Sequence, residues 1–371
     1  MIRWLVVLMG AFMTAGCAAA RLDQPGREPA AFLKVPPGFQ AEILVANVPN
    51  ARSMTLGDKG TLFVGTRSGG TVYAVRDVFG ASPVVQKFAE GLSMPNGVAF
   101  HDGALYVAEQ KRIVRYPAAE ERRDGPRLPE VVDPALPYKG VLHSWKYLAF
   151  GPDNKLYVPV GAPCNVCVEP GFGVILRMNA DGSGREVVAT GIRNSVGFDW
   201  QPGTGELWFT DNGRDMLGDD VPPCELNRVQ RPGLDFGFPY CHAGDIADPQ
   251  FGAAGRCSDS VAPVQKLGPH VAPLAVKFYT GSMFPGEYRN QALIAEHGSW
   301  NRSKEAGKTG YRITLVRLKG DTAVSYEPFI EGWLNGDEVL GRPVDLLVAP
   351  DGSLLVSDDQ RGVIYRISYQ R

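Results

Sequence analysis

Residues 150–163 read FGPDNKLYVPVGAP, a polar turn followed by a short apolar run that a leucine begins. The theme recurs along the chain, and successive leading leucines are 43 to 61 residues apart, with one longer separation of 86 residues. The leading leucines are Leu62, Leu105, Leu156, Leu207, Leu293 and Leu354. Short strands between Gly, Asp and Asn turns at this period are typical of propeller blades. The six units predict an all-β fold, a six-bladed β-propeller, because a two-sheet sandwich would not explain one recurring pattern.

The longest separation indicates an insertion around residues 230–275 in a single propeller domain of residues 21–371. Residues 1–20, MIRWLVVLMGAFMTAGCAAA, have an early arginine, an apolar stretch and then small residues, as in a secretory signal peptide. The segment TAGC also resembles a lipoprotein signal in which Cys17 would be lipidated, and simple cleavage near residues 18–20 is the alternative. We therefore expect an exported protein that is periplasmic or lipid-anchored to the cell envelope.

The bulk composition argues against one class of partner. The chain has 371 residues, of which 44% are hydrophobic and 21% are charged, as in an ordinary globular protein. Its net charge is −2 and it has no basic run, so nucleic acid is not an expected partner.

Five cysteines follow Cys17, and in an oxidising compartment they are expected to form disulfides. Cys164 with Cys167 and Cys241 with Cys257 are plausible local pairs, which leaves Cys224 unpaired. The motif CNVC is followed by valine rather than histidine, so c-type haem attachment is not expected. No second CxxC motif supports a zinc site.

Polar residues recur four positions after the leading leucines. These positions hold Thr66, Glu109, Val160, Asp211, His297 and Asp358. Because strand side chains alternate with a period of two, equivalent positions point the same way in every blade. The side chains either approach the central channel at one face or satisfy the backbone of the turns at the strand ends.

His143 and Arg193 occupy comparable places in neighbouring repeats. They are 50 residues apart, and the leucines that follow them are 51 residues apart. A histidine and the Arg193-Asn194 pair are therefore expected on the same rim of adjacent blades. Arg302 and Arg342 also lie just off repeated strands, and arginines suit the recognition of carboxylates.

Residues 209–229, FTDNGRDMLGDDVPPCELNRV, are rich in oxygen donors. Calcium binds six to eight oxygen ligands, including main-chain carbonyls such as those of Gly213 and Arg214. The segment has no EF-hand spacing, so a solvated acidic loop is an equal alternative.

The chain resembles the soluble sugar dehydrogenases of the glucose/L-sorbosone type, six-bladed propellers that depend on pyrroloquinoline quinone (PQQ). The resemblance extends from about residue 33 to residue 369, and HGSWNR and GRPVD make the sorbosone-type branch the most similar. The matching stretches are VPPGFQAEILVANVPNARSM, MPNGVAF, HSWKYLAFGPDNKLYVPVG, GIRNSVGFDWQPGTGELWFTDNGRD, ELNRV, HGSWNR and GRPVDLLVAPDGSLLVSDD.

The resemblance implies a role for each candidate residue. The histidine before the GPD turn, here His143, is the catalytic base. Arg193 and Asn194 contact cofactor and sugar, and Arg342 binds the quinone carboxylates; Arg302 is the candidate for the basic cofactor-facing residue of the fifth blade. The carbonyls of Gly213 and Arg214 hold calcium. Leu142 replaces the aspartate that precedes the histidine in the glucose-oxidising branch, which puts glucose as the substrate in doubt.

The implied chemistry agrees with these residue types. PQQ is an ortho-quinone with three carboxylates, which suits arginines and a divalent cation, and a neutral histidine can accept the proton of a sugar hydroxyl. We therefore expect an exported PQQ- and calcium-dependent dehydrogenase that oxidises a sugar or sugar-derived aldehyde and passes electrons to a quinone or other acceptor. The alternatives are a non-catalytic binding propeller and a calcium-dependent, lactonase-like hydrolase, which would use carboxylates such as Glu109, Asp211 and Asp358.

Overall fold

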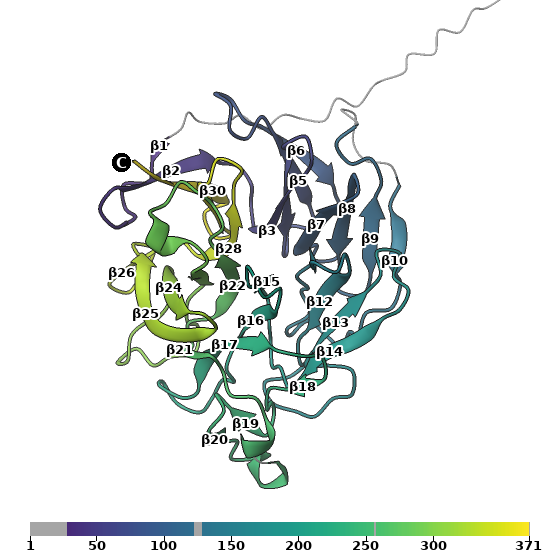
Figure 1. Cartoon of the computed structure of the whole chain (residues 1–371), viewed down its shortest axis with the longest axis vertical. Helices are drawn as coiled ribbons and strands as arrows, with labels where there is room; N and C mark the ends of the chain where they lie inside the picture. Colours follow the sequence, from purple (N-terminus) through teal and green to yellow (C-terminus); the bar gives the residue numbers. More distant parts are fainter. Residues whose placement is uncertain (1–27, 122–127, 256, 371) are drawn as a thin grey trace, which may run out of the picture.

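Six β-sheets surround a common axis like the blades of a propeller (Figure 1). The computed structural model describes residues 28–121, 128–255 and 257–370, so the expected signal segment with Cys17 lies outside the described residues. The prediction of an all-β, six-bladed propeller is confirmed. None of the helices in the described ranges is both long and apolar enough to span a bilayer.

Each blade contains four antiparallel strands. In blade order the strands are β3 (Ala51–Leu56), β4 (Leu62–Thr66), β5 (Val72–Arg76) and β6 (Val84–Ala89); β7 (Gly97–His101), β8 (Ala104–Ala108), β9 (Ile113–Tyr116) and β10 (Glu130–Asp133); β11 (Ala149–Phe150), β12 (Leu156–Val160), β13 (Val174–Met178) and β14 (Glu186–Thr190); β15 (Phe198–Trp200), β16 (Leu207–Asp211), β17 (Pro223–Val229) and β21 (Gln265–Pro269); β22 (Pro273–Phe278), β23 (Ala292–Glu296), β24 (Arg312–Lys319) and β25 (Thr322–Ile330); and β28 (Pro343–Val348), β29 (Leu354–Asp358), β30 (Val363–Tyr369) and β2 (Phe39–Val45).

The two ends of the described chain close the ring of blades. Strand β2, from the start of the chain, pairs with the C-terminal strand β30 in a register that runs from Phe39 opposite Tyr369 to Val45 opposite Ile364. The short strand β1 (Glu28–Pro29) adds to the outer edge of β2. This pairing joins residues more than 300 positions apart, so the last blade forms only when both ends are in place.

The leading leucines lie in the second strand of each blade and are buried. Apolar residues of neighbouring blades pack together there; for example, Tyr106 and Ala108 of β8 share one cluster with Leu156 and Val158 of β12. Burial of a leucine side chain contributes about 1.5–3 kcal/mol. The recurring leucine is thus one of the residues that pack each blade against its neighbours.

The fourth blade carries the extra segment between β17 and β21. It contains β18 (Leu234–Asp235), β19 (Cys241–His242), β20 (Ile246–Ala247), η1 (Gly252–Ala254) and η2 (Cys257–Asp259). The extra segment ends earlier than the expected range of about 230–275, because residues 265–269 and 273–275 belong to blade strands β21 and β22. Disulfides join Cys241 to Cys257 and Cys164 to Cys167, and Cys224 is free and buried, as predicted.

Short strands β26 (Leu334–Asn335) and β27 (Glu338–Val339) form a small hairpin before the last blade. Together with the loops that enter or leave the other blades, the loop after this hairpin contributes to a cavity at one end of the propeller. The fold therefore brings residues from distant parts of the sequence to one place.

Candidate active site

A cavity of about 330 Å³ collects most of the predicted site residues. Its lining residues come from the first, fourth, fifth and sixth blades and from the connection between the second and third blades, which places it near the central axis. Its walls consist of Arg52, Arg67, Leu142, His143, Trp145, Arg193, Asn194, Asn212, Gly213, Asp215, Cys224, His270, Ala272, Leu274, His297, Gly298, Trp300 and Arg342. The structure thus brings together His143, Arg193, Asn194, Gly213 and Arg342, and we refer to this space as the main cavity.

His143 is held in a defined protonation state. Its side chain is buried, and its Nδ1 lies 2.7 Å from the carbonyl oxygen of Ala162. A carbonyl only accepts hydrogen bonds, so Nδ1 carries the proton of the neutral ring and Nε2 has a free lone pair. Burial, and then the charge of Arg193, lower the pKa of His143 to about 3. His143 is therefore a neutral imidazole over the whole physiological pH range.

The backbone around His143 explains why glycine follows β12. His143 has a φ of 51°, in the left-handed region that few residues adopt. A Cβ atom on Gly161 would lie 2.8 Å from Cβ of His143 and 2.9 Å from Oδ1 of Asn194. A side chain at position 161 would therefore displace His143 or Asn194, and glycine allows the two to approach this closely.

The loop that holds Arg193 and Asn194 is fixed by a buried carboxylate. Asp211, at the end of β16, accepts hydrogen bonds from the backbone N–H of Arg193 at 2.8 Å and of Asn194 at 2.6 Å. Glu225 lies opposite Asp211 on β17, and burial raises the pKa of both carboxyl groups. Asp211 thus acts on the backbone of the site rather than lining the cavity.

The guanidinium group of Arg193 is itself largely committed to the protein. Its Nε and Nη2 donate to the carbonyl and side-chain oxygens of Asn165, both at 2.9 Å, and Nη2 also contacts Asp215 at 2.8 Å. Nη1 donates to the carbonyl of Asn212 at 3.2 Å. Four of its five N–H donors are therefore used, and Arg193 is oriented rigidly beside the cavity.

Two other arginines of the main cavity have no carboxylate partner in the described part of the chain. Arg342 donates to Nδ1 of His297 at 3.3 Å and to the hydroxyl of Tyr311 at 3.2 Å, both neutral groups. Arg67 lies 4.3 Å from the ring centre of Trp145, in a cation–π contact. Arg52, by contrast, pairs with Asp359 at 2.8 Å. The cavity therefore has an excess of positive charge at Arg67 and Arg342.

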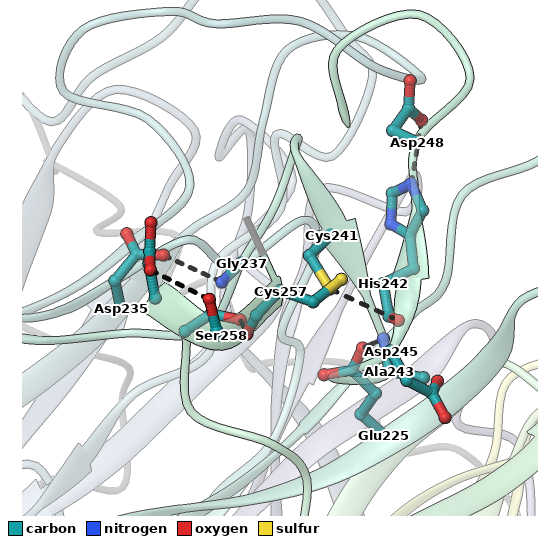
Figure 2. The surroundings of a disulfide bond; sticks show 12 residues. Glu225, Asp235, Gly237, Cys241, His242, Ala243, Asp245, Asp248, Cys257 and Ser258 are labelled. Atoms are coloured by element: carbon teal, nitrogen blue, oxygen red, sulfur yellow. Dashed lines mark hydrogen bonds and ion pairs between the residues drawn. A yellow bond between two sulfur atoms is a disulfide. The ribbon is translucent and has the colours of Figure 1, made fainter. Parts of the chain in front are cut away.

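The turn predicted to hold calcium lies partly at the cavity. Gly213 lines it, whereas the side chain of Arg214 points to the extra segment, where it pairs with Asp248. Asp248 is also bound by Nε2 of His242 at 2.8 Å (Figure 2). Beside the disulfide, the backbone N–H of Ala243 donates to Glu225 at 2.7 Å (Figure 2). The disulfide-closed segment therefore supports both the turn at Arg214 and the Asp211–Glu225 pair.

Side chains do not gather into a metal site in the described ranges, where no group of three or more His, Cys, Asp or Glu is arranged around one point. Glu109 and Asp358, proposed for the hydrolase alternative, accept hydrogen bonds from the backbone N–H of Ser93 and of Arg342, respectively. The feature that would mark the hydrolase, carboxylates converging on a centre, is not found among these residues.

Arg302 does not line the main cavity. It lies in a neighbouring hollow, and its guanidinium group donates to the carbonyls of Gly307, Ala306 and Asp219. It lies four residues beyond Gly298, on the loop between β23 and β24, and folds back onto that loop. Arg302 was expected at the cofactor because it follows the HGSW segment. The sequence could not show that its side chain lies outside the main cavity, because the direction of a loop side chain depends on its local hydrogen bonds.

Arg67 was not predicted as a site residue. The polar positions singled out in the sequence lie four residues after each leading leucine, whereas Arg67 lies five residues after Leu62. Thr66, four residues after its leucine, bonds to Thr71 in its own turn. Five residues after the leucines, Arg67, Asn212 and Gly298 line the cavity. Apart from His297, the polar residues in the four-residue register mainly satisfy strand-end backbone, which was the second interpretation.

Comparisons with known proteins agree with this architecture. The TrAA12-like family model matches residues 177–370. An uncharacterised protein of Borreliella burgdorferi is 35% identical over 354 residues, which cover 91% of this chain and 91% of that protein.

Solved structures of low sequence identity share the fold. The holo form of the PQQ domain of pyranose dehydrogenase from Coprinopsis cinerea has a TM-score of 0.77 and 19% identity, covering 93% of this chain and 98% of that one. The calcium structure of a Trichoderma reesei carbohydrate-active enzyme of family AA12 has a TM-score of 0.78 and 20% identity, with 96% and 100% covered. The family model spans half of the chain, and we conclude that this propeller belongs to the TrAA12-like family.

Proposed function

We propose that the protein is a PQQ-dependent dehydrogenase that oxidises a sugar or sugar-derived aldehyde in the main cavity. The observation that carries the proposal is the combination of a neutral histidine base with two arginines, Arg67 and Arg342, that have no carboxylate partner among the described residues. An anionic cofactor with several carboxylates would supply the missing partners. Of the two solved structures named above, one is the holo form of a PQQ domain and the other is a calcium structure, and they support the choice of cofactor and metal.

The donor set of the main cavity fits PQQ. Arg67 and Arg342 can each bind a carboxylate. The carboxylate of Asp211 holds the backbone of Arg193 and Asn194 and so positions both side chains at the cavity. The indole Nε1 of Trp145, a wall residue, is buried without a hydrogen-bond partner among the described residues and is available as a further donor. The carbonyls of Gly213 and Arg214 would hold calcium. Bound there, PQQ would supply a two-electron hydride acceptor and calcium a Lewis acid beside it.

His143 would perform the proton transfer. As the substrate carbon loses hydride, the hydroxyl proton moves to Nε2 of His143, while Nδ1–H remains bonded to Ala162. An anionic ligand bound in the main cavity would stabilise the positive charge that develops on the ring, and would so raise the pKa of His143 from its low value. The histidine is thus a base whose strength depends on the anionic ligand being present.

The finer points of the function rest on sequence. The segments HGSWNR and GRPVD favour a sorbosone-type substrate, and Leu142 before the histidine disfavours glucose. The leader-like residues 1–20 and two disulfides support export to an oxidising compartment, where the protein is either lipid-anchored at Cys17 or released by cleavage near residues 18–20. Electrons would leave to a quinone or another carrier.

A titration with PQQ tests the proposal. Calcium-loaded mature protein is titrated with PQQ while the quinone absorbance is followed, and candidate sugars are then added under anaerobic conditions. We expect binding at micromolar PQQ and bleaching by a sugar or sugar-derived aldehyde. Failure to bind at that concentration contradicts the proposal, and binding without bleaching by any sugar or aldehyde favours a propeller without catalytic activity.

A further inference from the structure

A second cavity of about 460 Å³ adjoins the main cavity and shares Trp300 and Arg342 with it. Its other walls come from the loop between β23 and β24 and from the small β26–β27 hairpin. These walls are Ser299, Arg302, Ser303, Lys304, Gly307, Lys308, Tyr311 and Asp337. A ligand longer than one sugar unit that enters the main cavity would therefore extend past Trp300 into this second cavity.

Trp300 stands at the junction with its side chain largely exposed. The residue is 71% exposed, although large aromatic residues are normally buried. The flat, C–H-rich face of a pyranose ring packs well on an indole, and the sugar hydroxyls around its rim remain in water. An exposed tryptophan between two hollows is thus suited to a sugar unit that crosses from one to the other.

The loop that carries Trp300 is fixed in place. Its base is closed by hydrogen bonds between Ser299 and Thr309 and by the hydroxyl of Tyr311, which donates to the carbonyl of Ser299 at 2.5 Å. Its tip is tied to the loop after β16, where the carboxylate of Asp219 accepts from the backbone N–H and hydroxyl of Ser303 at 2.6 and 2.7 Å. A loop held at both ends presents Trp300 without a large loss of entropy on binding.

The second cavity is positively charged. Four cationic residues line it, and Asp337 is the one carboxylate in its wall within the described chain. Arg302 is partly neutralised by Asp220, at 3.2 Å, and Lys308 donates only to the main-chain carbonyl of Asp337. Lys304 is exposed and has no ion-pair partner among the residues described. Lys304 and Lys308 are therefore available to an anionic group.

We propose that the second cavity is a subsite for a carboxylated sugar unit, so that the substrate class is an acidic oligosaccharide whose terminal unit is oxidised in the main cavity. The inference rests on the proposed function for its reaction, but the binding it describes does not require turnover. Trp300 would stack on the sugar ring, and Lys304 and Lys308 would bind the uronate carboxylate.

The test compares two probes that differ by one carboxylate, cellobiouronic acid (glucuronosyl-glucose) and cellobiose. Their binding to the mature protein is measured by calorimetry, with and without PQQ and calcium. We expect cellobiouronic acid to bind about tenfold more tightly at low salt, with the preference shrinking as ionic strength rises. The double variant Lys304→Gln/Lys308→Gln should lose the preference, and Lys319→Gln, an exposed lysine at the far end of β24, should keep it.

Equal binding of the two disaccharides, a preference that survives the double substitution, or no binding of either at millimolar concentration would each overturn the subsite. Both lysines are exposed, so thermal unfolding of the double variant should match that of the parent. PQQ titration of the same samples separates the two proposals. Normal PQQ binding without a preference contradicts the subsite alone, whereas a preference without PQQ binding contradicts the dehydrogenase alone.

Discussion

Nδ1 of His143 donates a hydrogen bond to the carbonyl oxygen of Ala162, 2.7 Å away. Ala162 follows β12, the second strand after His143 in the sequence, so the third blade itself fixes the histidine that precedes it. The contact selects one tautomer and leaves Nε2 as the proton-accepting atom. This hydrogen bond therefore fixes both the tautomer of the buried histidine and the nitrogen that can act as a base.

Replacement of His143 by glutamine should remove catalysis while sparing the fold. The glutamine amide can still donate to Ala162, but it cannot accept a proton. General base catalysis is worth about 10²–10⁴-fold, so we expect sugar-dependent bleaching of PQQ to slow by at least about a hundredfold. The PQQ dissociation constant should change only a few-fold. If His143→Gln oxidises sugars at the parent rate, His143 is not the base.

The buried histidine also predicts how stability depends on pH. The folded pKa of His143 is about 3, below its usual value of about 6.5, so between these values the unfolded chain binds a proton that the folded chain does not. Acidification through this window therefore favours unfolding, by up to about 1.4 kcal/mol for each pH unit. His143→Gln lacks this proton, and its melting temperature should fall less than that of the parent between pH 6.5 and pH 4.5.

Thermal unfolding of the two proteins at several pH values measures this difference directly. The raised pKa values of buried carboxyls such as Asp345 and Asp358 act in the opposite direction, but they are common to both proteins and cancel in the comparison. Parallel curves for parent and variant would show that His143 titrates normally in the folded state.

The fold was predictable because it repeats. Six leucines at blade spacing are visible without any structure, and each fills the same place in a buried second strand. The spacing of His143 and Arg193 likewise matched that of their blades, so their meeting in one cavity followed from the repeat. Sequence spacing thus carries information wherever the backbone is regular.

The remainder of the site depends on loop conformation. Arg67 enters the cavity because it lies one residue beyond the end of β4, whereas Arg302 folds back onto its own loop carbonyls. Both are arginines in loops that follow the second strand of a blade, and their directions depend on the contacts of those loops. The support of Arg214 by Asp248 was equally hidden, because it joins the predicted metal turn to an inserted segment with no counterpart in the repeat.

The two arginines without carboxylate partners predict the largest effects on cofactor affinity. Loss of a hydrogen bond to a charged group costs about 1.5–3 kcal/mol, so Arg342→Gln and Arg67→Gln should each weaken PQQ binding roughly ten- to a hundredfold. Arg317→Gln is a matched control, because that arginine pairs with Glu327 on the neighbouring strand β25. Equal PQQ affinity in all three variants would show that the excess charge of the cavity does not bind the cofactor.

Asp248→Asn should weaken calcium binding from outside the cavity. The change leaves the buried guanidinium of Arg214 without its carboxylate, and breaking a buried ion pair by removing one partner costs about 3–5 kcal/mol of stability. Because Arg214 also supplies a predicted calcium-binding carbonyl, the turn should loosen and the calcium dissociation constant, measured by calorimetry, should rise. The double variant Arg214→Gln/Asp248→Asn removes both charges and should lose less stability than the sum of the single changes. Additive losses, or calcium affinity unchanged in Asp248→Asn, would show that the disulfide-closed segment does not support the turn.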